Sequence, residues 1–159
     1  MTRRFPSVRA QDLDGTVLEL PHALAGDPSV VIVAFERGQQ AMVDTWLPWL
    51  SELQRLSPGI EVYEMPTISR RWLPARRLID GGMRAGIPDP ETRRRTVTTY
   101  TDVGAVLEAL GLPGTSTIAV VVVDAGGTIL WQGLGGYRAT LAAELAEAVT
   151  IARPPGGAG

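Results

Sequence analysis

The strongest constraint on the fold is a largely apolar run at residues 29–35 that is followed closely by an amphipathic helix. All six residues from Val30 to Phe35 are apolar, which is typical of a strand covered on both faces of a sheet. The apolar residues of the helix expected over 39–56 recur every three or four positions: Met42, Trp46, Trp49, Leu53 and Leu56. The two elements together predict a strand–loop–helix unit.

The rest of the chain alternates between expected strands and expected helices. Strands are expected at 17–20, 60–65, 96–100, 117–123 and 128–132, and helices at 73–85, 103–110 and 138–151. This order predicts an α/β, three-layer fold with a central mixed sheet, helices on both faces and an extended N-terminal lead-in. We expect one domain over residues 1–151 and a disordered tail over 152–159.

Composition excludes several kinds of chemistry. The chain of 159 residues has no cysteine, which rules out disulfides, thiolate metal sites and thiol–disulfide exchange. His22 is the only histidine, so no metal site is expected. The chain has no lysine for a phosphate-binding loop and no dinucleotide fingerprint, so no cofactor is expected. With no membrane span and no secretory signal, we expect a cytoplasmic protein.

The segment from Val30 to Val43 resembles the active-site corner of thioredoxin-like proteins, in the form with a long lead-in seen in peroxiredoxin-type and TlpA-type proteins. In that superfamily an aromatic residue precedes the first cysteine by five positions, and a helix-bending proline follows it by eight. Phe35 and Pro48 stand at these distances from Gln40. The resemblance covers about residues 5–151 and implies a thioredoxin-like fold.

The chain departs from this family at each position that carries redox function. Gln40 and Val43 occupy the two cysteine positions, and Ala34 stands where a buried carboxylate would assist thiol chemistry. Ser116 stands where a cis-proline is expected before the fourth strand. The resemblance therefore implies a scaffold without thiol redox activity that serves another use, since a fold alone does not define a function.

A narrower similarity concerns the thioredoxin-like domain of mitochondrial ATP synthase assembly factors. It rests on Arg37, Trp46, the stretch 83–88 and the ending from Val123 to Trp131. Those proteins are non-catalytic helpers in the assembly of proton-channel subunits. The similarity implies a binding or assembly role.

The first candidate site is the corner where the expected helix begins. Free backbone donors and the helix dipole at this end favour an anion, and an extended peptide is the other ligand that we consider. The candidate residues come from two loops: Arg37, Gln39, Gln40, Ser116 and Thr117. A small polar groove is expected between these loops.

The second candidate site is rich in arginine. Eight arginines against three acids give residues 70–95 a charge of +5, and the rest of the chain carries −7 of the overall −2. Arg70, Arg71, Trp72 and Arg84 are its candidate contact residues. The guanidinium group suits phosphate or carboxylate. The segment is either such a surface or the solvated face of a helix in an arginine-biased protein, and no nucleic-acid motif accompanies it.

These features favour a binding or assembly module that uses both candidate sites, with an unknown protein or a small anionic ligand as its partner. Two alternatives stay open. One is an enzyme of non-thiol chemistry, with Arg37, Gln40 and Ser116 forming a polar site. The other is a homo-oligomeric structural protein, such as a homodimer, that buries the region around Trp72.

Overall fold

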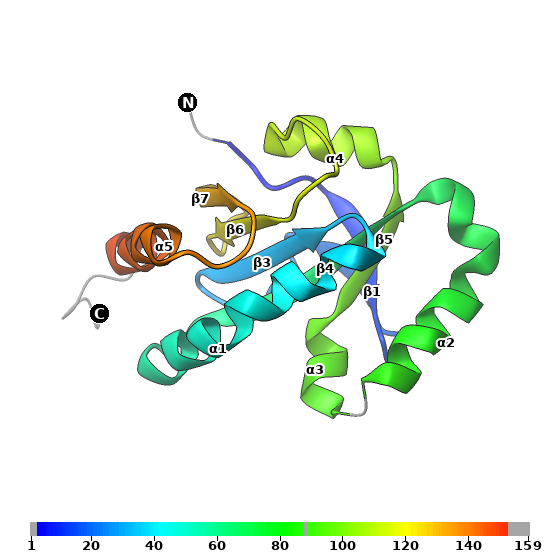
Figure 1. Cartoon of the computed structure of the whole chain (residues 1–159), viewed down its shortest axis with the longest axis horizontal. Coiled ribbons are helices and arrows are strands. Elements are labelled where there is room, and N and C mark those ends of the chain that lie inside the picture. Colours follow the sequence, from blue (N-terminus) through cyan, green and yellow to red (C-terminus); the bar gives the residue numbers. More distant parts are fainter. Residues whose placement is uncertain (1–2, 88, 153–159) are drawn as a thin grey trace.

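A seven-stranded sheet flanked by helices forms the centre of the molecule (Figure 1). The computed structural model describes residues 3–87 and 89–152, apart from the side chain of Arg84. The strands are β1 (Val8–Asp12), β2 (Val17–Leu20), β3 (Ser29–Ala34), β4 (Glu61–Ser69), β5 (Val97–Thr101), β6 (Ala119–Val123) and β7 (Ile129–Leu134). The helices are α1 (Gln40–Leu56), α2 (Arg76–Gly86), α3 (Pro90–Arg95), α4 (Val103–Leu110) and α5 (Ala139–Ala152), with two 3₁₀ helices, η1 (Arg37–Gln39) and η2 (Arg70–Ala75).

The strand order is β2-β1-β5-β4-β3-β6-β7. The central strands β3, β4 and β5 are parallel, and both flanks of the sheet are antiparallel. The lead-in thus joins the sheet, because β1 pairs with both β2 and β5. The mixed sheet confirms the expected α/β architecture.

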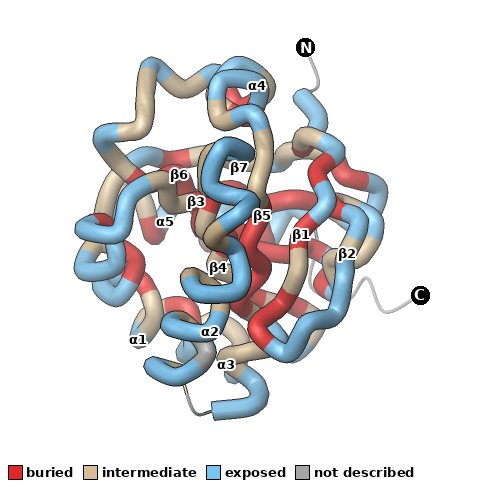
Figure 2. Tube along the Cα trace, turned by 90° about the vertical axis from the view of Figure 1, so that its right-hand side faces the viewer, coloured by how far each residue is buried: buried red, intermediate tan, exposed pale blue. Residues whose placement is uncertain are grey.

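Two apolar clusters cover the two faces of the sheet. One contains Trp46, Leu50 and Leu145 and packs α1 and α5 against β3 and β6. The other contains Tyr63 and Leu110 and packs α4 and the lead-in on the opposite face. The central strands are therefore covered on both sides, and Figure 2 shows their trace as largely buried. Burial on both faces explains the continuous apolar run of β3.

The strand β4 continues past residue 65, where the sequence predicted that it would end, as far as Ser69. Pro66 lies opposite Ala34, which is the last residue of β3. Beyond this level β4 pairs with β5 alone and continues to Ser69. Because β3 ends here, the missing N–H of Pro66 interrupts little of the ladder.

The connection between β4 and β5 contains more helix than the sequence indicated. The helix expected over 73–85 is divided, with Pro74 inside η2 and α2 beginning at Arg76. The helix α3 was not expected, although its signal is present, because Asp89 accepts a hydrogen bond from the Thr92 N–H at 2.9 Å and proline follows Asp89.

The C-terminal helix also extends further than expected. Ala152 is the last residue of α5, whereas the tail was expected to begin there. The rest of that tail, 153–159, lies outside the described residues.

Candidate functional site

The corner between β3 and α1 is held together by one buried glutamine, Gln39. Its Oε1 accepts hydrogen bonds from the N–H groups of Phe35 at 2.8 Å and Glu36 at 3.2 Å. Its Nε2 donates to the carbonyl of Thr115 at 2.6 Å and to Glu36 Oε2 at 3.3 Å. The side chain is only 3% exposed. Gln39 therefore connects the two loops of the corner, and both of its polar atoms are hydrogen-bonded within the fold, while its expected ligand contact stays a prediction.

Gln40 is exposed and connects two carboxylates that the sequence did not indicate. Its Nε2 donates to Asp44 Oδ1 at 2.9 Å and to Glu64 Oε1 at 3.2 Å. Burial and, to a smaller extent, the charge of Asp44 raise the pKa of Glu64, although the Gln40 hydrogen bond opposes this shift. A sequence signal for Glu64 exists, because it is the one acid between Val62 and Met65 in a largely apolar strand.

The facing loop contributes Ser116 and Thr117. Ser116 is exposed, and its backbone groups form no backbone hydrogen bond within the described chain. Thr117 donates its hydroxyl to Met42 Sδ at 3.7 Å. The cis peptide bonds among the described residues precede Pro21 and Pro28, so this loop is trans throughout. The corner thus lacks the cis-proline geometry as well as the cysteines.

The redox positions are filled by groups that cannot support thiol chemistry. Val43 is 2% exposed and belongs to the apolar cluster under α1. Ala34 packs against the same cluster and carries no ionisable group. Arg37 is exposed and lies in η1 beside the start of α1. The rim of the corner is therefore formed by Arg37, Gln40 and Ser116.

The arginine-rich segment divides into two parts. Arg93 pairs with Asp14 at 3.0 Å and Arg95 pairs with Glu61 at 2.7 Å, while Arg94 pairs with Glu91, so these three arginines stabilise α3 and its surroundings. The other part is residues 70–78 of η2 and α2, which we call the arginine-rich surface. Its four arginines are exposed: Arg70, Arg71, Arg76 and Arg77. The side chain of Arg84 lies outside the described part.

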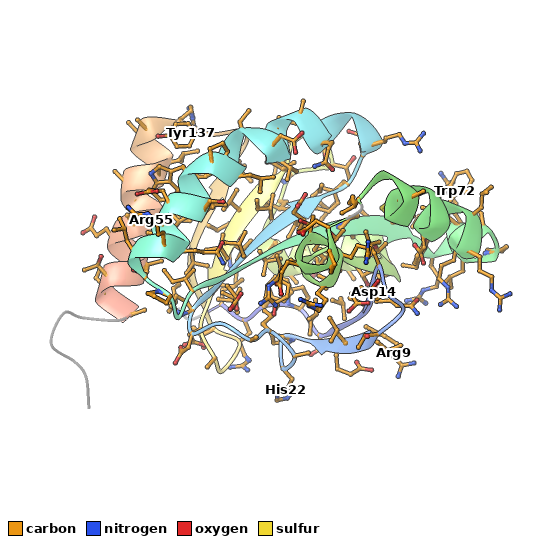
Figure 3. The ribbon with its side chains drawn as sticks, turned by 90° about the horizontal axis from the view of Figure 1, so that it is seen from below. Arg9, Asp14, His22, Arg55, Trp72 and Tyr137 are labelled. Carbon is orange, nitrogen blue, oxygen red and sulfur yellow. The ribbon has the colours of Figure 1, made fainter. Side chains whose placement is uncertain are left out.

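Both candidate sites lie at the same edge of the sheet. β3 and β4 are parallel, so the corner after β3 and the segment after β4 follow their carboxyl ends (Figure 1). No hydrogen bond or ion pair between described side chains joins the two sites. Trp72 is 49% exposed and lies at the opposite end of the molecule from Arg55 (Figure 3). Arg55 is in the last turn of α1, whereas the corner lies at the start of that helix.

Two surface hollows lie away from the corner. One of about 400 Å³ lies between the β1–β2 turn and α2, and its lining includes Asp12, Asp14, Arg76, Arg77 and Asp80. The other, of about 350 Å³, lies between β7 and α5 beside Trp131 and Glu144. Within residues 3–87 and 89–152 no group of three or more acids and histidines is placed to hold a metal. In the same ranges, no helix has the length and apolarity needed to cross a membrane.

Comparison with solved structures relates this fold to thiol-exchange proteins. A thiol:disulfide interchange protein from Bacteroides sp. matches with a TM-score of 0.59 and 20% identity, over 99% of this chain and 95% of its own. The thioredoxin domain of a Bacteroides vulgatus thiol-disulfide oxidoreductase matches with a TM-score of 0.54 and 19% identity, over 92% and 95%. A proposed electron transfer protein from Aquifex aeolicus matches with a TM-score of 0.64 and 18% identity, over 98% and 96%.

No protein-family model matches the sequence, and a search of curated proteins finds no significant match. The structural matches confirm the thioredoxin-like fold expected from Phe35, Gln40 and Pro48. The molecule has a thioredoxin-like α/β fold, and its sequence contains no cysteine. It has the scaffold of that fold and lacks the thiols on which disulfide exchange depends.

Proposed function

We propose that this protein is a binding module without redox activity, and that its corner recognises an extended polypeptide segment. The observation that carries the proposal is the Gln39 bridge, which connects the two loops while Ser116 stays exposed and forms no backbone hydrogen bond with the described residues. Exposed backbone donors and acceptors pair readily with an extended peptide. A preformed site also loses little conformational entropy on binding.

The charges around the corner favour a peptide over a small anion. Arg37 supplies a positive charge, while Asp44 and Glu64 place two carboxyl groups beside Gln40. A simple anion at the start of α1 would be repelled by Asp44, and by Glu64 where it is ionised. A peptide can satisfy both signs with different side chains. We propose the arginine-rich surface as a second, separate contact surface.

Selection of a random peptide display library on the immobilised protein tests the corner, with calorimetric titration of the selected peptides. We expect Ser116→Trp to block the loop and weaken binding at least about tenfold, which is about 1.4 kcal/mol. Ser116→Ala keeps the backbone and should bind normally. The variant Arg37→Ala removes a positive charge from the corner. Its control is Arg9→Ala, which removes the same charge from β1, away from the corner. Failure to select any peptide, or equal binding by Ser116→Trp, would overturn the proposal.

A second candidate function is acid–base catalysis, which the raised pKa of Glu64 favours. A partly buried carboxyl group beside a second carboxylate is typical of sites where proton transfer occurs. Hydrolase substrates offered to the wild type and to Glu64→Gln test this role. Turnover by the wild type that the variant lacks would support it, and equal rates with every substrate would dismiss it.

A further inference from the structure

Four guanidinium groups on the arginine-rich surface have no anionic partner in the part of the chain described. Arg70, Arg71, Arg76 and Arg77 form no ion pair or side-chain hydrogen bond with described residues. Asp80 lies on the same hollow as Arg76 and Arg77, but its carboxylate accepts the Tyr100 hydroxyl at 2.9 Å. Asp12 and Asp14 line the same hollow, but Asp12 accepts the N–H groups of Asp14 and Thr16, and Asp14 pairs with Arg93. Arg70 and Arg71, exposed on η2 outside this hollow, carry positive charge that faces solvent.

Apolar side chains stand exposed among these arginines. Leu78 is 81% exposed, Trp72 is 49% exposed and Leu73 is 40% exposed. The Arg71 guanidinium lies 5.7 Å from the centre of the Trp72 ring, so its charge lies beside an apolar plane. Leu78 follows Arg77 on the first turn of α2. Exposure of this apolar area costs free energy that burial against a partner would recover.

We infer that the arginine-rich surface docks the protein on an anionic lipid bilayer. The arginine fork suits lipid phosphates, and Trp and Leu side chains suit the boundary between headgroups and acyl chains. Trp72 and Leu73 are consecutive on η2 and Leu78 follows on α2, and three exposed apolar side chains among four arginines suit shallow insertion into a bilayer boundary.

The distribution of charge supports the same partner. Residues 70–78 contain four arginines and no acid and so carry +4, while the rest of the chain carries −6 of the overall −2. An anionic surface would attract the first part and repel the second, so the molecule would approach with η2 and α2 foremost. Figure 1 places α2 at the opposite side of the molecule from α5. The inference rests on the proposed function only in treating residues 70–78 as a contact surface.

Co-sedimentation of the full chain with vesicles tests the inference. We expect binding to phosphatidylcholine vesicles that contain phosphatidylglycerol, little binding to pure phosphatidylcholine, and loss of binding as salt increases. The double variant Arg70→Gln, Arg71→Gln should weaken binding roughly thirtyfold, if each arginine contributes about 1 kcal/mol. The matched control Arg9→Gln, Arg55→Gln removes the same charge elsewhere and should bind like the wild type.

Two further readouts separate this inference from its alternatives. Tryptophan emission should shift to the blue on phosphatidylglycerol vesicles, and the shift should disappear in Trp72→Phe. The corner variant Arg37→Ala should bind vesicles normally, so that failure of the corner proposal leaves this result unaffected. Equal sedimentation with both vesicle types would overturn the inference. Binding to a polyglutamate peptide without vesicle binding would overturn it in favour of an acidic protein partner.

Discussion

At the residue scale, two adjacent glutamines have opposite roles. Gln39 is buried and bonded to both loops of the corner, while Gln40 is exposed and contacts two carboxylates. The sequence placed both at the start of a helix but could not tell which side chain turns inward. The difference arises because Thr115, the partner of Gln39, lies 76 positions further along the chain.

We expect Gln39→Leu to lower the free energy of unfolding by about 2–4 kcal/mol, because it removes the partner of three partly buried backbone groups of the corner. The matched variant Gln40→Leu, at an exposed position, should lower it by about 1 kcal/mol or less. Urea unfolding measures both. Equal losses in the two variants would contradict the assigned role of Gln39.

Glu64 gives a pH dependence with a definite sign. The pKa of Glu64 is raised in the folded state above the ordinary 4.5. Between these two pKa values, the carboxyl group is protonated in the folded protein and ionised in the unfolded chain. The contribution of Glu64 to stability is therefore present below pH 4.5 and declines as pH rises through the folded pKa. We expect Glu64→Gln to gain stability relative to the wild type as pH rises through this window.

Glu52→Gln is the control for this experiment, because the pKa of Glu52 is shifted in the opposite direction from that of Glu64. The hydrogen bond with Arg55 lowers the pKa of Glu52, so its contribution is present above the ordinary pKa and is lost as pH falls. Thermal unfolding across acidic pH measures both variants against the wild type. If the stability difference from the wild type changed with pH in the same direction in both variants, the raised pKa of Glu64 would be contradicted.

At the scale of elements, a hydrogen bond between two described side chains joins α2 to the sheet. The Tyr100 hydroxyl on β5 donates to Asp80 Oδ1 on α2 at 2.9 Å, and burial together with Asp80 raises the pKa of Tyr100. The sequence predicted β5 and most of α2 from their composition. It did not indicate this contact, because the residues lie on different elements and meet only when β5 is placed beside β4.

Tyr100→Phe should therefore loosen α2. We expect faster amide hydrogen exchange over 76–86 and a loss of about 1–2 kcal/mol, because the hydrogen bond to a carboxylate is removed. Tyr137→Phe is the matched control, since no described partner bonds its hydroxyl and its ring packs on Trp46 at 5.5 Å. Unchanged exchange in α2 of Tyr100→Phe would show that other contacts hold the helix.

At the scale of the whole molecule, a net charge of −2 conceals a strongly basic end. The arginines at 93–95 are paired within the fold, whereas those at 70–77 are exposed. An exposed basic surface of this kind binds a negatively charged matrix even when the net charge of the protein is negative.

We expect the protein to be retained on a cation-exchange matrix at neutral pH and low salt, although its sequence pI is about 5.4. Neutralising Arg70, Arg71, Arg76 and Arg77 should abolish retention, because it removes the exposed positive surface. The variant Arg9→Gln, Arg55→Gln should still be retained. Passage of the wild type through the column would show that the surrounding acids screen the arginines.

The sequence alone determined what chemistry is absent and which fold class is present. A chain without cysteine has no thiolate, and apolar periodicity is a local property that states which segments are strands and helices. The spacing of Phe35 and Pro48 about Gln40 also placed the corner correctly.

Only the tertiary structure decided how the polar residues are used. Gln39 connects the two loops of the corner, and Gln40 donates to Asp44 and Glu64. The arginines at 93–95 form ion pairs with acids, while those at 70–77 are exposed. The physical reason is that a hydrogen bond or ion pair depends on distances between distant segments, which local patterning does not contain.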